Sequence, residues 1–179
     1  MKISIVIPYY KNKETITLLV ESIKDQDYDN WEIVIVMDGR DDDEFSLLEQ
    51  NFENENNIIL KCLDTNSGAP KARNIGAALC SGKFLFFVDA DCQLYPGTLS
   101  TIIETFKDNP DASFVYGNYR YDNQTNFTSK PFNFEELKTF NYVTTMSPVK
   151  REVFEEVNGF RVGLEFFQDW DLFYRIAAK

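Results

Sequence analysis

Short apolar runs alternate with amphipathic segments along the first half of the chain. Each run is six or seven residues long and rich in Ile, Val, Leu or Phe, which is typical of strands buried on both faces. These strands are expected at residues 2–7, 31–37, 58–63 and 83–88, the first being stopped by Pro8. Between them, apolar positions at helical spacing predict helices at 14–24, 41–48 and 70–80. The alternation predicts βαβ units and a mainly parallel sheet.

The regular alternation weakens after residue 91. The patterns there predict strands at 113–121 and 142–146 and helices at 96–107, 131–140, 151–157 and from 168 onward. A polar loop is expected at 122–130, and its two formal glycosylation sequences, at Asn123 and Asn126, are interpreted as chance because no secretory signal opens the sequence. We expect one domain over 1–179, truncated at its C-terminus because the last helix has no stop signal.

Charge and composition exclude several classes of function. The net charge is −11, from 18 Lys and Arg against 29 Asp and Glu, which argues against nucleic acid as a partner. No apolar run approaches the roughly 20 residues of a membrane helix, so we expect no integral membrane segment and a cytoplasmic location. The chain has no His, which excludes Ser-His-Asp and Cys-His nucleophiles. The three Cys lack zinc-site spacing, so any metal must rest on oxygen ligands.

Polar side chains follow each of the four predicted strands. They are Tyr9 and Tyr10, Asp38, Asp64 and Asn66, and Asp89 and Asp91. Because ligands of parallel sheets bind beyond the carboxyl ends of the strands, these residues predict a binding site there. The carboxylates of Asp89 and Asp91 suit Mg²⁺ or Mn²⁺ holding a diphosphate, although an isolated Asp-Ala-Asp could also be a turn with two solvated acids. No Gly-x-Gly-x-x-Gly follows the first strand, so a dehydrogenase is not expected.

Six segments in a fixed order carry a resemblance to a known family. They are 4–10, 35–39, 68–76, 87–91, 158–160 and 168–172. Together they resemble inverting glycosyltransferases of family two, which have the GT-A fold. The resemblance implies an α/β fold, with a mainly parallel central sheet in a nucleotide-binding α/β/α sandwich and a smaller mixed acceptor-side part. Residues 1–91 would be the nucleotide-sugar-binding half and 92–179 the acceptor-side half.

The resemblance also implies roles for individual residues. Those that would bind the nucleotide are Pro8, Tyr9 and Tyr10 around the base through backbone and ring, Asp38 on the ring N–H of the base, Arg73, and Asp89 near the ribose. Asp91, with Asp89, would hold Mn²⁺ or Mg²⁺, and Asp169 would be the general base. Three alternatives stay open: Arg73 as a solvated helix residue, Asp169 as a helix N-cap, and Asp171 as the base.

The implied reaction is a metal-dependent transfer of a sugar from a nucleoside-diphosphate sugar to an acceptor hydroxyl. Single displacement with an Asp base would invert the anomeric centre. A UDP-sugar is favoured as donor and a carbohydrate or lipid-linked molecule as acceptor, in the cytoplasm or at the cytoplasmic face of a membrane. The alternative is a nucleotide-sugar-binding module without transfer activity. A nucleotidyltransferase is disfavoured because the loop after Tyr9 contains no Gly.

Three positions depart from the family pattern. Met37 stands where an acid is usual, and Lys11 where Asn is common. Gln168 replaces the Glu that usually precedes the base, which puts contacts to the donor sugar or acceptor in doubt but leaves Asp169 in place.

Overall fold

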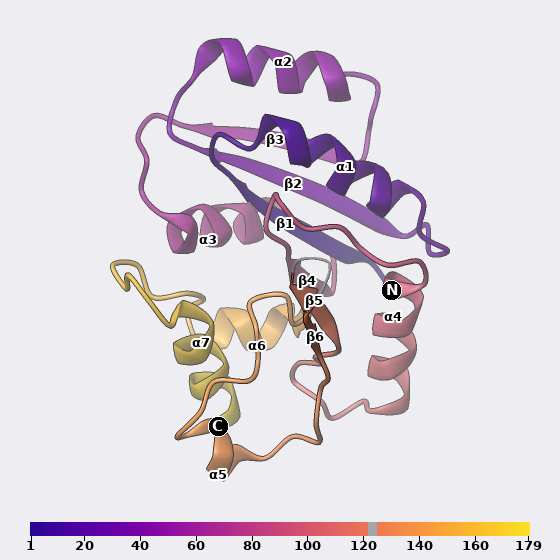
Figure 1. Ribbon diagram of the computed structural model, residues 1–179, viewed down its shortest axis with the longest axis vertical. Coiled ribbons are helices and arrows are strands. Elements are labelled where there is room, and N and C mark those ends of the chain that lie inside the picture. The colour runs from indigo at the N-terminus through magenta and orange to yellow at the C-terminus, as the bar shows by residue number, and fades with distance from the viewer. Residues whose placement is uncertain (122–124) are drawn as a thin grey trace.

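A computed structural model describes residues 1–121 and 125–179 (Figure 1). Its centre is a five-stranded sheet in the order β3-β2-β1-β4-β7. The strands are β1 (Ile3–Tyr9), β2 (Trp31–Asp38), β3 (Ile58–Leu63), β4 (Phe84–Phe87) and β7 (Val149–Lys150). The first four are parallel, and the two-residue β7 pairs antiparallel with β4 at the edge. The α/β fold with a mainly parallel sheet is therefore confirmed.

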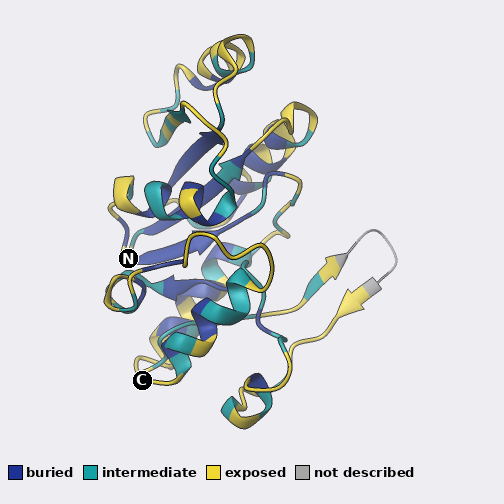
Figure 2. Cartoon of the chain, turned by 90° about the vertical axis from the view of Figure 1, so that its left-hand side faces the viewer, coloured by how far each residue is buried: buried dark blue, intermediate teal, exposed yellow. Residues whose placement is uncertain are grey.

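Helices cover both faces of the sheet. One face packs against α1 (Lys13–Lys24), α2 (Asp42–Phe52) and α4 (Thr98–Asp108). The other packs against α3 (Ala69–Leu79), α6 (Arg151–Glu156) and α7 (Gln168–Ala177). The remaining elements are the hairpin strands β5 (Tyr119–Tyr121) and β6 (Thr125–Phe127) and the short α5 (Phe134–Leu137). The hairpin extends away from the sheet, as Figure 2 shows.

Strand side chains alternate between two apolar layers. Ile5 of β1 and Phe86 of β4 belong to the cluster beneath α1 and α4, whereas Val6 and Leu85 belong to the cluster on the α6 and α7 side. All four side chains are at most 3% exposed. Figure 2 shows the central strands in the buried colour between the two helical layers. Because both faces are covered, the strands are apolar at nearly every position rather than at every second one.

The first strand continues through Pro8 instead of stopping there. Val6 accepts from the backbone N–H of Val88, so the backbone groups of even-numbered β1 residues face β4. The register of β1 with β4 ends at Val6, whereas its register with β2 continues to Tyr9. The pairing of β1 with β4 therefore ends where Pro8 has no N–H to continue it, while the other edge of β1 stays paired with β2.

The second half departs further from the sequence patterns. The strand predicted at 142–146 is wrong: Val143 is fully buried but lies in irregular backbone, and the edge strand is formed by Val149 and Lys150 instead. Of the strand predicted at 113–121, only 119–121 form one, together with an isolated bridge from Phe114. Asn123 lies outside the described residues. In the described part of the chain, no helix is long and apolar enough to cross a membrane.

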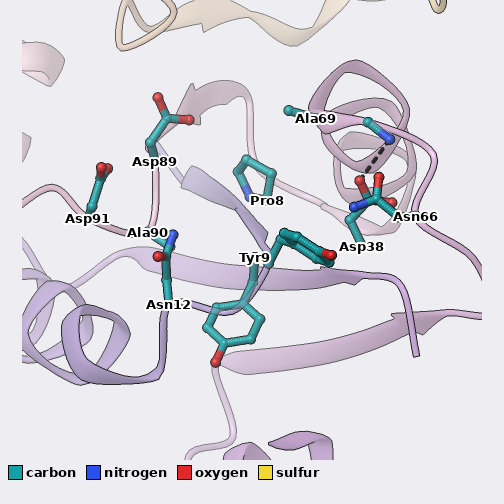
Figure 3. A pocket seen from close by; sticks show the side chains of 11 residues that line it. Pro8, Tyr9, Asn12, Asp38, Asn66, Ala69, Asp89, Ala90 and Asp91 are labelled. Atoms are coloured by element: carbon teal, nitrogen blue, oxygen red, sulfur yellow. Dashed lines mark hydrogen bonds between the residues drawn. The ribbon is translucent and has the colours of Figure 1, made fainter. Parts of the chain in front are cut away.

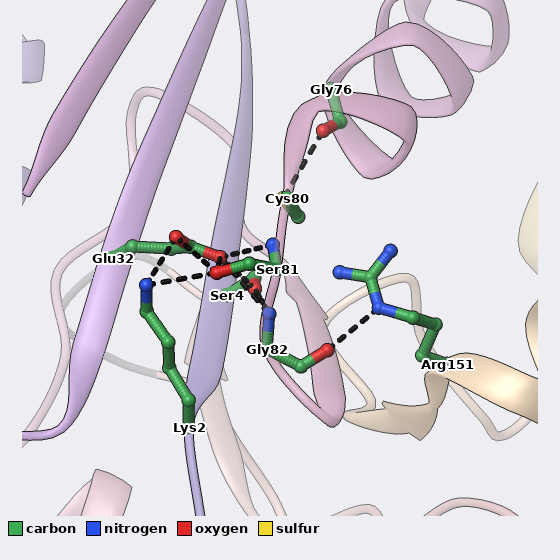
Figure 4. A network of polar contacts seen from close by, with 8 residues as sticks. All are labelled: Lys2, Ser4, Glu32, Gly76, Cys80, Ser81, Gly82 and Arg151. Carbon is green, nitrogen blue, oxygen red and sulfur yellow. Dashed lines mark hydrogen bonds and ion pairs between the residues drawn. The ribbon is translucent and has the colours of Figure 1, made fainter.

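A polar cluster holds the N-terminal edge of the sheet together (Figure 4). Glu32 of β2 is 7% exposed, and its Oε1 accepts from Ser4 Oγ at 2.6 Å, Ser81 N at 2.5 Å and Gly82 N at 3.0 Å. Its Oε2 pairs with Lys2 Nζ at 2.5 Å. Burial alone would raise the pKa of Glu32, but the hydrogen bonds from Lys2, Ser4 and Ser81 lower it to about 2. The cluster ties β1, β2 and the turn before β4.

Candidate active site

A pocket of about 420 Å³ opens at the carboxyl ends of the parallel strands. It is lined by Pro8, Tyr9, Tyr10, Asn12, Asp38, Asn66, Gly68, Ala69, Asp89, Ala90 and Asp91. Figure 3 shows Asp38 at one end of the pocket and Asp89 and Asp91 at the other, with Pro8 between them. The structure thus brings together the predicted residues from the ends of β1, β2 and β4, as expected for a parallel sheet.

The carboxylate of Asp38 binds the backbone of the loop that leads into α3. Its Oδ1 accepts from the backbone N–H of Ser67 at 2.7 Å and its Oδ2 from that of Gly68 at 2.8 Å. Gly68 is the N-cap of α3 with φ of +88°, a conformation that a side chain would strain. Each carboxylate oxygen can still accept a second hydrogen bond, but the first two bonds shape the pocket wall.

The end of β1 contributes backbone and one exposed ring. The ring of Tyr9 is fully buried, and its hydroxyl donates to Glu44 Oε1 of α2 at 2.5 Å. Tyr9 belongs to the pocket lining, as predicted for the end of this strand, although its ring is buried. Tyr10 is 48% exposed, and Lys11 Nζ lies 5.2 Å from its ring centroid. Tyr10 is the ring available for stacking.

A second hollow of about 310 Å³ adjoins the first. Tyr10 and Asn66 line both, so the ring of Tyr10 stands at their boundary. The cationic side chains of Lys11 and Arg40 belong to the lining of the second hollow. Together the two hollows provide an elongated site along the sheet edge.

The predicted metal ligands differ in their surroundings. Asp91 is exposed, whereas Asp89 is 45% exposed and its Oδ1 pairs with Arg73 Nη2 at 2.7 Å. Within the described residues, no three His, Cys, Asp or Glu side chains gather to hold an ion. Burial, together with the negative charges of Asp89 and Asp91, raises the pKa of the neighbouring Cys92 thiol to about 12. The donor set fits Mg²⁺ or Mn²⁺ only where diphosphate and water oxygens complete the coordination.

Arg73 lies beneath the pocket rather than on its wall. Its side chain is 6% exposed, so it is not the solvated helix residue that was one alternative. Nη2 binds Asp89, and Nη1 donates to Gln168 Oε1 at 3.1 Å. The guanidinium carbon lies 5.4 Å from the ring centroid of Phe160. Arg73 therefore reaches the site through Asp89, and direct contact with a nucleotide stays a prediction.

Asp169 occupies the first turn of α7. The N-cap of this helix is Phe167, so the N-cap alternative for Asp169 is not what forms. Its Oδ1 accepts from the backbone N–H of Trp170 at 2.8 Å, and the side chain is half-buried. Burial and then the negative charge of Asp169 raise the pKa of Tyr119, a tyrosine of the hairpin. Asp169 makes no ion pair among the described residues.

Asp171, two residues further on, binds two arginine side chains. Its Oδ2 binds Arg175 Nε at 2.9 Å and Nη2 at 2.7 Å, and its Oδ1 binds Arg161 Nη1 at 2.8 Å. Both carboxylate oxygens of Asp171 are therefore held by guanidinium groups.

The glycosyl transferase family 2 profile matches residues 4–167, most of the chain. The chain belongs to glycosyltransferase family 2. It is 34% identical, over 65% of its length, to the glucosyl-dolichyl phosphate glucuronosyltransferase of Haloferax volcanii, 38% of which is covered. This relative is considerably longer than the part that aligns.

Solved structures confirm the GT-A fold of this family 2 chain. Staphylococcus aureus TarS 1–349 in complex with UDP-GlcNAc superposes with a TM-score of 0.77 at 22% identity, over 96% of this chain and 52% of that one. The mannosyltransferase PcManGT from Pyrobaculum calidifontis, in complex with GDP-Man and Mn²⁺, gives 0.77 at 20% identity, over 98% and 51%. The chain thus spans about half the length of these two solved chains.

Sequence reasoning missed two contributors to this family 2 site. Asn12 lines the pocket, and the only indication was the polar loop that follows the first strand. The charge of Asp169 also acts on Tyr119, but a tyrosine in a weak strand pattern carries no sign of such an interaction. Gln168 was noted as a departure from the family, and the structure gives it a definite partner in Arg73.

Proposed function

We propose that this chain transfers a sugar from a nucleoside-diphosphate sugar to an acceptor hydroxyl. The observation that carries the proposal is the pocket at the sheet edge, where Asp38 marks one end and Asp89 and Asp91 the other. A nucleotide can span such a pocket with its base toward Asp38 and its diphosphate toward the two aspartates. Membership of glycosyltransferase family 2 supports this reading.

The donor side would be built from residues of β1, β2 and β4. The Tyr10 ring would stack on the base, and Asp38 would accept from its ring N–H, which uracil and guanine both offer. We favour a UDP-sugar, and the UDP-GlcNAc complex of TarS supports that choice of donor class.

Asp91 and Asp89 would hold Mn²⁺ or Mg²⁺ together with the diphosphate oxygens. Bound there, the ion would neutralise charge on the departing diphosphate as a Lewis acid. The exposure of Asp91 and the acidity of the chain, with a net charge of −11, make such neutralisation necessary for binding an anionic donor. The Mn²⁺ in the PcManGT complex supports a divalent ion in this fold.

Asp169 would take the proton of the acceptor hydroxyl as it attacks. A base positioned in this way is typically worth 10²–10⁴-fold in rate. Attack on the face opposite to the departing diphosphate would invert the anomeric centre in a single displacement. Asp169 is supported over Asp171 because Arg161 and Arg175 occupy the latter.

The acceptor would be a carbohydrate or a lipid-linked molecule. Exposed apolar side chains stand just before the proposed base, with Phe166 at 74% and Phe167 at 65% exposure. The Haloferax volcanii relative is named for a dolichyl-phosphate-linked acceptor, which supports a lipid-linked class. Such an acceptor would place the reaction at the cytoplasmic face of a membrane.

A second candidate is donor binding without transfer. Every residue that lines the main pocket lies between Pro8 and Asp91, so the pocket does not depend on α7 or its aspartate. This alternative keeps the donor-site roles and removes only the base.

Ligand-induced stabilisation followed by a transfer assay tests both candidates. Thermal unfolding is measured with a panel of nucleoside diphosphates and nucleotide sugars, with and without Mn²⁺. The proposal expects a higher melting temperature with at least one uridine nucleotide, increased further by Mn²⁺. No shift with any nucleotide would overturn the donor site. A shift without sugar transfer to any carbohydrate or lipid-linked acceptor would favour the binding module.

A further inference from the structure

One buried guanidinium connects the two ends of the proposed reaction. Arg73 of α3 binds Asp89 Oδ1 at 2.7 Å through Nη2 and Gln168 Oε1 at 3.1 Å through Nη1. Asp89 follows β4 on the donor side, and Gln168 is the first residue of α7, directly before Asp169. The two partners of Arg73 are far apart in the chain but meet on the same planar group.

The neighbouring residue on α3 fixes the same region from a second point. Asn74 Nδ2 donates to the carbonyl of Phe160 at 2.8 Å, and its Oδ1 accepts from the backbone N–H of Phe160 at 2.9 Å. The Phe160 ring lies against the Arg73 guanidinium. With its side chain 6% exposed and contacts on both sides, Arg73 has little freedom to change its position. The planar guanidinium holds both partners in a fixed relative geometry.

The summed charge of Arg73 and its two partners depends on the residue at position 168. Arg73 has one carboxylate partner, Asp89, and one neutral partner, Gln168. Its Nε is buried without a hydrogen-bond partner within the described chain. A Glu at 168 would add a negative charge beneath a site that already presents Asp89 and Asp91 to an anionic donor. Gln168 provides the same acceptor oxygen without that charge.

We propose that Gln168 and Arg73 are positioning residues, and that their hydrogen bond fixes the start of α7, and with it Asp169, relative to the donor-side carboxylate Asp89. The inference rests on the proposed function, since it takes Asp89 as a donor contact and Asp169 as the base. Neither Arg73 nor Gln168 is among the residues that line the pocket.

Hydrogen–deuterium exchange with UDP and Mn²⁺ tests this coupling without requiring turnover. In the unmodified chain, the ligand is expected to slow exchange both at 66–71, beside the pocket, and at 168–171, at the start of α7. In Gln168→Ala, protection at 66–71 persists and protection at 168–171 is lost. Equal protection of 168–171 in both proteins would overturn the inference. Absence of protection at 66–71 in the unmodified chain would instead overturn the donor site, and the inference with it.

Kinetics separate positioning from a merely structural role. Gln168→Ala should lower kcat about 10–100-fold with donor Kd changed less than about 2-fold, because a misplaced base loses rate rather than binding. Gln168→Glu retains the acceptor oxygen, so kcat should stay within about 3-fold while donor Kd weakens in a salt-sensitive way. Gln50→Ala, an exposed change on α2, is the matched control. Equal kcat for Gln168→Ala and the control would contradict the proposal.

Discussion

Asp169 and Asp171 share the first turn of α7 but have opposite electrostatic surroundings. Asp171 is held by the guanidinium groups of Arg161 and Arg175, whereas Asp169 accepts only the backbone N–H of Trp170 among the described residues. Two carboxylates only two residues apart are thereby distinguished: Asp171 is held by two arginines, whereas Asp169 makes no ion pair among the described residues.

Asp169→Asn is expected to remove transfer while leaving donor binding intact. The amide cannot take the acceptor proton, so kcat should fall by at least about 10²-fold with little change in Kd for the donor. Steady-state transfer and calorimetric donor titration measure the two quantities. The matched change Asp171→Asn should instead lower the free energy of unfolding by about 1–3 kcal/mol through lost charge-assisted hydrogen bonds. Transfer surviving in Asp169→Asn would make the base assignment wrong.

Asp91→Asn is expected to abolish the metal dependence of nucleotide binding. The proposed metal site has two carboxylates, and no third ligating side chain gathers there within the described residues, so losing one would leave too few anionic ligands for Mn²⁺. Titration of UDP with and without Mn²⁺ should then give the same weak affinity. Asp108→Asn, which removes the same charge from the exposed end of α4, should behave like the unmodified chain. An unchanged Mn²⁺ effect in Asp91→Asn would count against the ligand role.

Gly159→Ala is expected to be strongly destabilising. A Cβ there would lie 2.6 Å from Asn74 Oδ1 and 2.9 Å from the Phe154 ring, at a backbone φ of +63°. Overpacking and strain together should lower the free energy of unfolding by about 2–4 kcal/mol, measured by urea denaturation.

Gly163→Ala provides the comparison for that substitution. Gly163 also has a positive φ, +96°, but no atom lies within 4 Å of an added Cβ. Backbone strain alone should cost about 1 kcal/mol. If the two variants were equally stable, the contact between Gly159 and Asn74 would not be the cause of the larger effect.

Acid is expected to weaken the fold through Glu32. Its pKa falls from 4.5 to about 2 on folding, so the carboxylate stabilises the native state fully above pH 5 and loses that contribution as the pH falls toward 2. The loss should be on the order of 3 kcal/mol, seen in urea denaturation at a series of pH values. Glu32→Gln should be less stable at pH 7 and flatter between pH 5 and 2, whereas the exposed Glu49→Gln should keep the original slope. A parallel slope in Glu32→Gln would exclude this cluster as the cause.

The first half of the fold could be predicted because its patterns are local. The strand at Ile58–Leu63 has the predicted bounds, and the acids at 38, 89 and 91 reach one pocket because parallel strands share a carboxyl edge. Pro8 was misjudged because its missing N–H affects only the edge of β1 that faces β4, and the pairing with β2 on the other edge continues to Tyr9.

The second half could not be predicted in the same way. Val143 is as buried as a strand residue, yet its apolar character reflects packing against α6 and α7 rather than strand pairing. The hydrogen bond between Arg73 and Gln168 joins residues 95 positions apart, and no periodicity reports such a contact. The direction of the Tyr9 ring could not be predicted either. A tyrosine at a strand end has the same sequence pattern whether its ring faces solvent or, as here, is buried in the core.

The continuous span of the pocket lining has a practical consequence for protein engineering. The residues that line the main pocket all lie between Pro8 and Asp91. If this pocket binds the donor as proposed, donor preference should be exchangeable between family members by exchanging this one continuous segment. The exchanged segment would have to retain Arg73 and Asn74, because their side chains bind Gln168 and Phe160 of the other parental part. A recombinant that keeps those contacts would inherit its nucleotide sugar from one parent and its acceptor from the other.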